Sequence, residues 1–196
     1  MNPGINLQSS DREIISDFLE GNRSSFNYLV LKYQKKVYWV IRRLVVDHDD
    51  ADDITQEVFI KLYRSLQEFR GESSLFTYLY KIAVNYSLNH LKKNKKKYER
   101  ERNMDSESID LQDDSKNAEA AMSDAYNERL LKEAILVLPE QQRAVFTLRF
   151  YDELSYDEIS KILDRSVGGL KANYFHAFKK IQAFLTEKKK KGLIDL

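Results

Sequence analysis

The chain has 196 residues, enough for one domain or two small ones, and its 32 Lys and Arg nearly balance its 31 Asp and Glu, so the net charge of +1 says nothing about partners. The absence of cysteine excludes disulfides, cysteine-based zinc sites and thiol catalysis, and it fits a reducing, cytoplasmic location. No secretory signal opens the sequence and no apolar stretch of about 18 residues is present, so we expect no membrane insertion.

The composition predicts an all-α protein, because the chain has two Pro, six Gly and almost no alternation of apolar and polar residues. A first helix is expected over residues 10–20, where Ser10 and Glu13 form a capping box and Gly21 ends the helix. The next three helices are expected over residues 25–46, 50–69 and 74–100.

Residues 101–117 are polar and acidic, and they are predicted to form a flexible linker. Helices are expected again over residues 118–138, 139–151, 155–163 and 167–190. The sequence therefore predicts two small helical domains, residues 10–100 and 118–190, joined by a flexible acidic linker.

Charged residues are segregated along the chain into blocks of one sign. Residues 47–57 hold six acids and no Lys or Arg, whereas residues 92–102 hold seven bases and two acids. Residues 103–124 are acidic again, and residues 165–191 hold eight bases and one acid. Such segregation is typical of separate surfaces for separate partners; solvated helix faces are the alternative.

The helix predicted over residues 50–69 has an apolar stripe and an opposite polar face. The stripe consists of Ile54, Val58, Leu62, Leu66 and Phe69. On the other face Ile60 stands among Asp53, Gln56 and Glu57, an arrangement that fits a protein-docking surface; a plain solvent face is the alternative. A metal site is not expected, because no His or further acid completes a coordination shell.

The helix predicted over residues 74–100 has an aromatic and basic stripe opposite its apolar one. The stripe consists of Tyr78, Lys81, Asn85, Leu88 and Lys92. Lysines contact phosphates, aromatic rings stack on unpaired bases and amides bond to base edges, so the stripe favours a nucleic-acid surface with an exposed Tyr78. The alternative is a lysine-rich helix end that the helix dipole favours.

Residues 155–184 have the spacing of a helix-turn-helix. Ser155 and Glu158 form a second capping box at its start. After the turn, Lys171 and His176 can reach base edges or phosphates, and Phe175 can contact a thymine methyl group. An ordinary αα-hairpin is the alternative.

Two stretches of the sequence resemble the conserved domains of one family, the extracytoplasmic-function (ECF) sigma factors of bacterial RNA polymerase, within the sigma-70 superfamily. The first stretch is DDADDITQEVFIKLYRSLQEFRGESSLFTYLYKIAVNYSLNHLKK and the second is LPEQQRAVFTLRFYDELSYDEISKILDRSVGGLKANYFHAFKKI. The resemblance implies a promoter-specific transcription initiation factor rather than an enzyme, without cofactor or catalytic residues. Such a sigma subunit directs core RNA polymerase to promoters and helps to open the DNA.

The resemblance also implies roles for particular residues. Docking on the clamp coiled coil of the largest core subunit would use Asp52, Asp53, Gln56, Glu57 and Ile60. Contacts to the minus-ten element, with a base flipped from the non-template single strand, would use Arg70, Gly71, Glu72, Ser73, Ser74, Tyr78, Lys81 and Asn85, with Lys92 of the basic stripe beyond them. Contacts to the minus-thirty-five duplex would use Lys171, Ala172, Asn173, Phe175, His176 and Lys179. An anti-sigma factor is a further expected partner.

The chain departs from the family pattern at some of these positions. Many members have Trp where Tyr78 stands, although an aromatic ring is retained. Arg is frequent at the positions of Asn173, His176 and Phe178, and Thr at Gly169, so the promoter sequence does not follow from the resemblance.

Two other functions compete with the sigma factor. An ordinary helix-turn-helix repressor or activator would leave residues 49–100 without a role. A metal-dependent nuclease that uses Asp52 and Asp53 is a more distant alternative.

Overall fold

The computed structural model describes residues 5–69, 71, 73–102 and 130–190, with the side chains of residues 95–102 excepted, and every regular element among them is helical. The N-terminal group of helices comprises α1 (Asp11–Leu19), α2 (Phe26–Val45), α3 (His48–Ser65) and α4 (Leu75–Arg102), with 3₁₀ turns at Arg23–Ser25 and Leu66–Glu68. The C-terminal group comprises a helical segment over 130–136, then α6 (Glu140–Phe150), α7 (Tyr156–Leu163) and α8 (Val167–Lys190). The all-α prediction is confirmed. Residues 103–129, which include most of the predicted linker, lie outside the described residues.

Side-chain caps determine where several helices begin. At α1, Ser10 Oγ accepts a hydrogen bond from the Glu13 backbone N–H at 3.3 Å, and Glu13 Oε2 accepts one from the Ser10 backbone N–H at 2.6 Å. Ser155 and Glu158 make the same reciprocal pair at α7, at 3.2 and 2.8 Å. Both predicted capping boxes are therefore present.

Helix α3 begins earlier than the sequence predicted. Residues 47–49 were expected to lie between two helices, but Asp47 is the N-cap of α3, and its Oδ1 accepts a hydrogen bond from the Asp50 backbone N–H at 3.0 Å. An Asp side chain satisfies a free N–H group at the helix start as well as Ser does, which is the reason for the difference.

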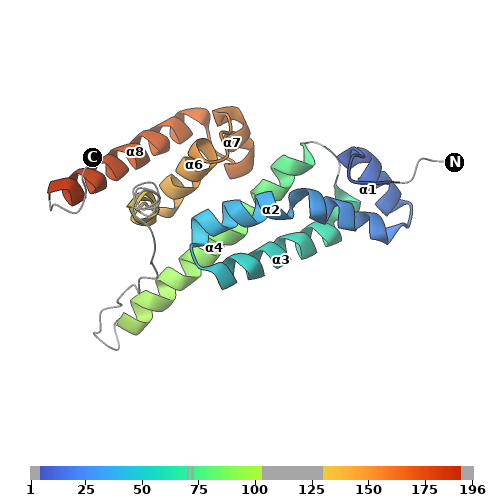
Figure 1. The fold of residues 1–196 in the computed structure, drawn as a ribbon, viewed down its shortest axis with the longest axis horizontal. Helices are drawn as coiled ribbons and strands as arrows, with labels where there is room; N and C mark the ends of the chain where they lie inside the picture. Colours follow the sequence, from blue (N-terminus) through green and yellow to red (C-terminus); the bar gives the residue numbers. More distant parts are fainter. Residues whose placement is uncertain (1–4, 70, 72, 103–129, 191–196) are drawn as a thin grey trace, which may run out of the picture.

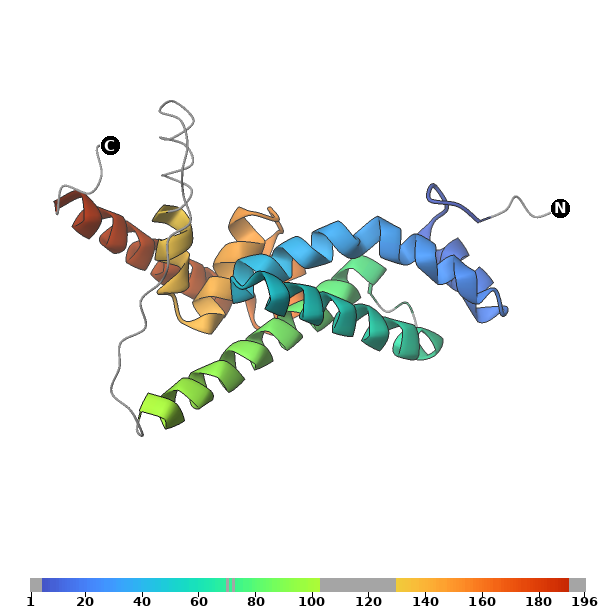
Figure 2. The same cartoon turned by 60° about the horizontal axis from the view of Figure 1, so that its bottom comes forward.

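The two groups of helices pack directly against each other (Figure 1). Helices α2, α3 and α4 contact one another pairwise, and α1 packs on α2. In the C-terminal group, α7 contacts α4, and α6 contacts both α2 and α4. Figure 2 shows the far end of α4 extending away from the other helices.

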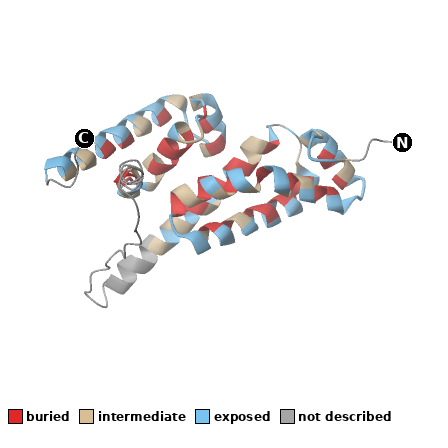
Figure 3. Ribbon diagram, in the orientation of Figure 1, coloured by how far each residue is buried: buried red, intermediate tan, exposed pale blue. Residues whose placement is uncertain are grey.

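One hydrophobic core runs through both groups. It includes Leu44 of α2 and Val84 of α4 together with Leu148 of α6 and Ile159 of α7, all fully buried. Figure 3 shows that buried residues, in red, gather on the sides of the helices that face one another. A smaller cluster lies within the C-terminal group, around Phe146 and Ile181. The predicted two-domain layout thus takes the form of two helical groups with a shared core.

Arg143 of α6 ties the two groups together through backbone carbonyls. Its Nη1 donates to the Leu44 carbonyl oxygen at 2.9 Å, and its Nη2 donates to the Leu136 carbonyl oxygen at 2.6 Å. Leu44 lies in the last turn of α2, where carbonyl groups lack helical partners. The buried guanidinium of the C-terminal group therefore provides a hydrogen-bond partner for a carbonyl group at the end of α2. Burial lowers the pKa of Arg143, without removing its charge at neutral pH.

We predict that Glu153→Gly stabilises the protein. Glu153 lies in the loop between α6 and α7, is exposed, and has a φ of 54°, a conformation that glycine adopts without a Cβ clash. Relief of that clash, less the entropy cost of glycine, should raise the free energy of unfolding by about 0.5–1 kcal/mol, measured by urea denaturation.

The matched control is Asp157→Gly in the first turn of α7, which is exposed but helical. It should lower the free energy of unfolding by about 1 kcal/mol. Equal destabilisation by both substitutions would contradict the positive φ at Glu153.

Candidate polymerase and nucleic-acid interfaces

Helix α3 buries one side and exposes the other. The apolar stripe predicted from the sequence is buried at Ile54, Val58, Leu62 and Leu66, and Phe69 is partly buried. Ala51 and Phe59, which the stripe did not include, are buried as well. All five predicted docking residues are exposed: Asp52, Asp53, Gln56, Glu57 and Ile60. We refer to these five residues as the docking face.

The chemistry of the docking face is acidic around one apolar residue. Ile60 is 51% exposed, although it is a large aliphatic side chain. Asp52 lies 3.6 Å from His48 Nε2, one turn earlier in the helix, so it is the one acid of the face with a described ion-pair contact. An exposed aliphatic residue ringed by carboxylates is suited to a partner that offers apolar and basic side chains together.

A groove of about 500 Å³ separates the docking face from the second half of α4. Asp53 and Glu57 line one wall, and Lys92 and Lys93 line the other. At the end of the groove the Asp50 carboxylate lies 2.9 Å from His90 Nε2. The acidic and basic residues were predicted on separate faces, but the packing of α3 against α4 brings them to the two sides of one groove.

Lys92 therefore lies apart from the rest of the predicted minus-ten residues. It follows Tyr78 by fourteen residues in the same helix, which corresponds to about 21 Å at about 1.5 Å per residue. The lysines at 95–97 extend the basic run, but their side chains lie outside the described residues.

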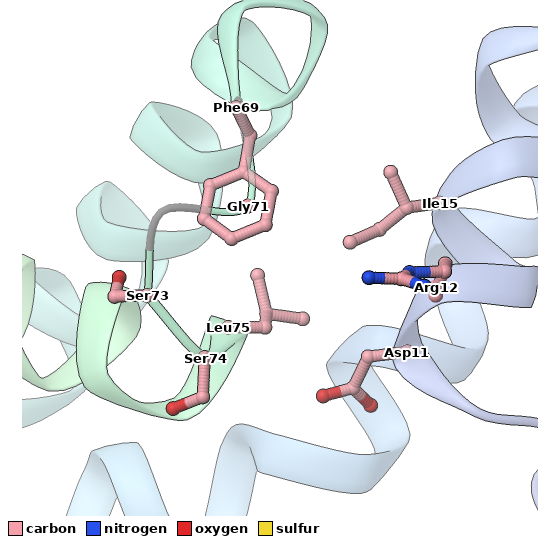
Figure 4. A pocket seen from close by; sticks show the side chains of 8 residues that line it. All are labelled: Asp11, Arg12, Ile15, Phe69, Gly71, Ser73, Ser74 and Leu75. Atoms are coloured by element: carbon pink, nitrogen blue, oxygen red, sulfur yellow. The ribbon is translucent and has the colours of Figure 1, made fainter.

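The turn between α3 and α4 has a cavity on each side. The first, of about 360 Å³, separates the turn from α1 (Figure 4). Asp11 and Arg12 of α1 face Gly71, Ser73 and Ser74 across it. Arg12 was not predicted as a site residue, because only the tertiary packing of α1 brings it to this turn.

The second cavity, of about 480 Å³, lies between the turn and α4 and is a candidate site for a nucleobase because of its lining. We call it the Tyr78 pocket. It is lined by Ser65, Glu68, Phe69, Gly71, Ser73, Thr77, Tyr78, Lys81 and Lys161. Aromatic rings, hydroxyl groups and lysines are thus available together, as stacking, hydrogen bonding and phosphate contact require.

Tyr78 is held in position and is not freely exposed as the sequence suggested. Its hydroxyl donates to Ser65 Oγ at 2.9 Å, and its ring lies 5.3 Å from the Phe69 ring, centroid to centroid. The side chain is partly buried by these contacts, while Lys81 and Asn85 of the same stripe are exposed. Leu88, which the helical pattern also placed on this stripe, is only 6% exposed and belongs to the core.

The turn itself combines a glycine with a helix cap. Gly71 has a φ of +71°, and no atom lies within 4 Å of a Cβ placed there, so the position requires glycine for its backbone and not for space. Ser74 caps α4, because its Oγ accepts a hydrogen bond from the Thr77 backbone N–H at 3.1 Å. Arg70 and Glu72, both predicted minus-ten residues, lie outside the described residues.

Lys161 is a second lining residue that was not predicted from the sequence. It belongs to α7, in the C-terminal group, yet it lines the Tyr78 pocket. Its contribution depends on the contact between α7 and α4, which no local pattern in the sequence signals.

The helix-turn-helix prediction corresponds to α7 and α8. Asp164 ends α7 in a left-handed conformation, with a φ of 54°, and Ser166 Oγ accepts a hydrogen bond from the Gly169 backbone N–H at 3.3 Å at the start of α8. Of the predicted duplex-contacting residues, Lys171, Ala172, Phe175, His176 and Lys179 are exposed, and Asn173 is partly buried.

The exposed side of α8 is aromatic as well as basic. Phe175 is 56% exposed and Phe178 is 52% exposed. Lys179 Nζ lies 5.7 Å from the centre of the Phe175 ring, and Lys171 Nζ lies 5.8 Å from that of Tyr156. These cation–π contacts orient the lysines without neutralising them, so their charge stays available to an anionic partner.

Within residues 5–69, 71, 73–102 and 130–190, no group of three or more His, Asp or Glu side chains is arranged to hold a metal ion. Among those same residues, no helix combines the length and the apolar character needed to cross a bilayer.

Comparison with protein families matches two parts of the chain. The sigma-70 region 2 model matches residues 29–97, and the sigma-70 region 4 model matches residues 128–181. The first match contains the docking face and the Tyr78 pocket except Lys161, and the second contains α7 and most of α8.

Curated relatives cover nearly the whole chain. The RNA polymerase sigma-H factor of Pseudomonas aeruginosa is 34% identical over 181 residues, which are 87% of this chain and 91% of that protein. The ECF RNA polymerase sigma-E factor of Haemophilus influenzae is 36% identical over 180 residues, 89% of this chain and 95% of the relative. The Escherichia coli K12 sigma-E factor is 36% identical over 178 residues, with 87% and 91% covered.

Two solved structures share the fold. The sigma factor RpoE of Bartonella quintana, in complex with the anti-sigma factor NepR, superposes with a TM-score of 0.61 at 20% identity over 82% of this chain and 96% of that one. CnrH, in complex with the cytosolic domain of CnrY, superposes with a TM-score of 0.64 at 19% identity over 91% of this chain and 99% of that one.

The sequence identity to the curated relatives and the coverage of both chains establish the family. Its members are transcription initiation factors and not known enzymes. The chain belongs to the extracytoplasmic-function sigma factors of the sigma-70 family, and it is a promoter-specific transcription initiation factor that directs RNA polymerase.

Proposed function

We propose that the two helix groups divide the work of initiation. Residues 10–100 dock on core RNA polymerase and open the minus-ten element, residues 118–190 read the minus-thirty-five element as duplex, and residues 101–117 connect them. The observation that carries this proposal is that three chemically different exposed surfaces lie on three helices, α3, α4 and α8.

The docking face is the contact to core polymerase in this proposal. Ile60 supplies the apolar centre, and Asp53 and Glu57 supply charge beside it. The partner is the clamp coiled coil of the largest core subunit. Charge complementarity around one apolar anchor would direct the approach and fix the register of two helical surfaces.

The Tyr78 pocket receives a base flipped from the non-template strand. The rings of Phe69 and Tyr78 offer a stacking surface, and the hydroxyl groups of Ser65 and Thr77 offer hydrogen bonds to base edges. Lys81 and Asn85, exposed beside it, contact the phosphates and neighbouring bases. Ser73 and Ser74 contribute from the turn, and Arg70 and Glu72 keep their roles on the family resemblance alone.

The N-terminal half of α8 reads the minus-thirty-five duplex. Lys171 and His176 supply polar contacts, Phe175 meets a thymine methyl group, and Ala172 lets the helix approach the groove closely. Because arginine is absent from this face, we expect the duplex contacts to rely more on shape and apolar contact than on bidentate guanine recognition.

Two further features of the function follow from the family. The Bartonella quintana structure is a complex with an anti-sigma factor, and the CnrH structure is a complex with the cytosolic domain of CnrY; we extend an anti-sigma partner to this chain. We also place the protein in the cytoplasm, where RNA polymerase works, with no catalytic activity of its own.

The division of work predicts a defined outcome in run-off transcription. Purified core polymerase with the full chain should give a promoter-specific transcript from a template selected by mapping transcript starts after overexpression. If the protein binds specific duplex DNA tightly but directs no transcript, it acts as an ordinary helix-turn-helix regulator and the proposed roles of α3 and α4 are wrong.

Charge reversal on the docking face should weaken core binding. We predict that Asp53→Lys with Glu57→Lys lowers the affinity for core polymerase at least about tenfold, or about 1.4 kcal/mol, with an unchanged circular dichroism spectrum. The measurement is a fluorescence binding titration at fixed ionic strength.

The matched control is Glu153→Lys with Asp157→Lys, which makes the same charge change on exposed positions of the C-terminal group. It should leave core affinity within about twofold of the wild type, since exposed charges far from an interface contribute little. Equal losses in both double variants would show a net-charge effect and would remove the docking face from the interface.

Removing one lysine from α8 should weaken duplex binding specifically. We predict that Lys171→Ala costs about 1–3 kcal/mol in binding to minus-thirty-five duplex and little in binding to minus-ten single strand. The control Lys190→Ala removes an exposed charge from the last turn of the same helix and should cost less. A loss confined to single-stranded DNA would mean that the two groups have the opposite assignments.

A further inference from the structure

A buried carboxylate lies where the two helix groups meet. Asp152 follows α6, and its Oδ1 lies 3.3 Å from Arg43 Nη1 of α2 and 3.5 Å from the Tyr80 hydroxyl of α4. The Asp152 side chain is only 13% exposed, and Tyr80 is 2% exposed. The Arg43 guanidinium also lies 4.5 Å from the centre of the Tyr151 ring. One acidic side chain of the C-terminal group is thus held by two residues of the N-terminal group.

The carboxylate is incompletely satisfied in this position. Its second oxygen, Oδ2, is buried without a hydrogen-bond partner among the described residues. The Tyr80 contact is at the long limit for a hydrogen bond. Burial raises the pKa of Asp152 to about 6, although Arg43 and Tyr80, the polar groups that face it from α2 and α4, act in the opposite direction. An ionised Asp152 is therefore less well accommodated here than a protonated one.

In this structure the two helix groups pack together, which we call the closed arrangement. The residues proposed to contact the two promoter elements are then too close together to reach both elements. Lys161 of α7 lines the Tyr78 pocket, and Lys171 of α8 lies over Tyr156 at the other end of α7. Helix α7 has 8 residues, which is about 12 Å at about 1.5 Å per residue. The minus-ten and minus-thirty-five elements are about 25 base pairs apart, or about 85 Å at about 34 Å per turn. The two groups must therefore separate before both elements are bound.

We propose that Asp152, with Arg43 and Tyr80, is a proton-sensitive latch that holds the C-terminal helix group on the N-terminal one and loosens when Asp152 ionises. The consequence for promoter binding rests on the proposed function, whereas the latch is a property of the free protein. No other interaction between the groups combines a buried acid with partners on two helices in the part of the chain that the structure describes.

The direction of the pH effect follows from the two states of Asp152. In the open protein the carboxyl group is in water and has its ordinary pKa, whereas the closed protein raises that pKa. The closed state therefore binds the proton more tightly, and its advantage is present at low pH and is lost as the pH rises through about 6. Between pH 5 and pH 7.5 the ratio of closed to open protein should fall about tenfold.

The absence of native cysteine makes a distance measurement on the full chain straightforward. Asn27→Cys on α2 and Ala183→Cys on α8 are exposed and would carry a spin-label or fluorophore pair. In the wild-type background we expect the label distance of the closed structure to dominate at pH 5, and its population to decrease about tenfold relative to the other distances at pH 7.5.

Three variants in the labelled chain test the latch. Asp152→Asn cannot ionise, so the closed fraction should stay the same at pH 5 and pH 7.5. Arg43→Gln leaves an ionised carboxylate without its cation, so the closed fraction should fall at pH 7.5 and recover at pH 5. Asp157→Asn, an exposed acid on α7, should keep the wild-type response.

A pH response that survives in Asp152→Asn, or a wild-type distance distribution that is the same at both pH values, overturns the proposal. If circular dichroism shows that Asp152→Asn does not fold, the test is Arg43→Gln alone. Recovery of its closed fraction at pH 5 then supports the latch, and no recovery overturns it. Because the measurement contains neither polymerase nor DNA, its failure is distinct from a failure in run-off transcription, which tests the proposed function.

Discussion

The burial of α4 on two sides is the constraint on which the other surfaces depend. Leu79, Tyr80, Ile82, Ala83 and Val84 are all buried, and at about 100° per residue they cover about 200° of the helix circumference. A helix that packs on one neighbour needs only about half of that width. The N-terminal helices cover one part of the arc and the C-terminal group covers the other, so that Tyr78, Lys81 and Asn85 occupy the remaining sector. The candidate nucleic-acid surface is therefore what the two contacts leave uncovered.

Local features were predictable from the sequence because their causes are local. The capping boxes at Ser10 and Ser155 need only four consecutive residues, and both are present in the structure. The apolar stripe of α3 follows from the helical period, and the exposure of Ile60 opposite Val58 and Leu62 follows with it.

Features that depend on packing between helices distant in the sequence could not be predicted in this way. Leu88 was placed outward, although it is buried, because a helical wheel divides a helix into one buried and one exposed side. Lys161 lines the Tyr78 pocket because α7 contacts α4, and Arg12 lines the neighbouring cavity because of the way α1 packs. In each case the missing information is which other helix lies alongside, and this depends on long-range packing.

The closed arrangement leaves two of the three candidate surfaces free. The docking face on α3 and the exposed side of α8 do not take part in the contact between the groups, whereas the Tyr78 pocket has Lys161 of α7 in its wall. In the proposed function, docking on polymerase is therefore compatible with the closed protein, whereas a minus-ten strand in the Tyr78 pocket would meet Lys161 of α7. An apolar residue in place of Asp152 would remove the pH dependence, but it would leave Arg43 and Tyr80 without their partner. An Asp152 carboxylate that is ionised at neutral pH keeps the contact between the groups specific, through Arg43 and Tyr80. It also keeps this contact weak enough to open. The free energy for opening can then come from the DNA contacts that replace the contact between the groups.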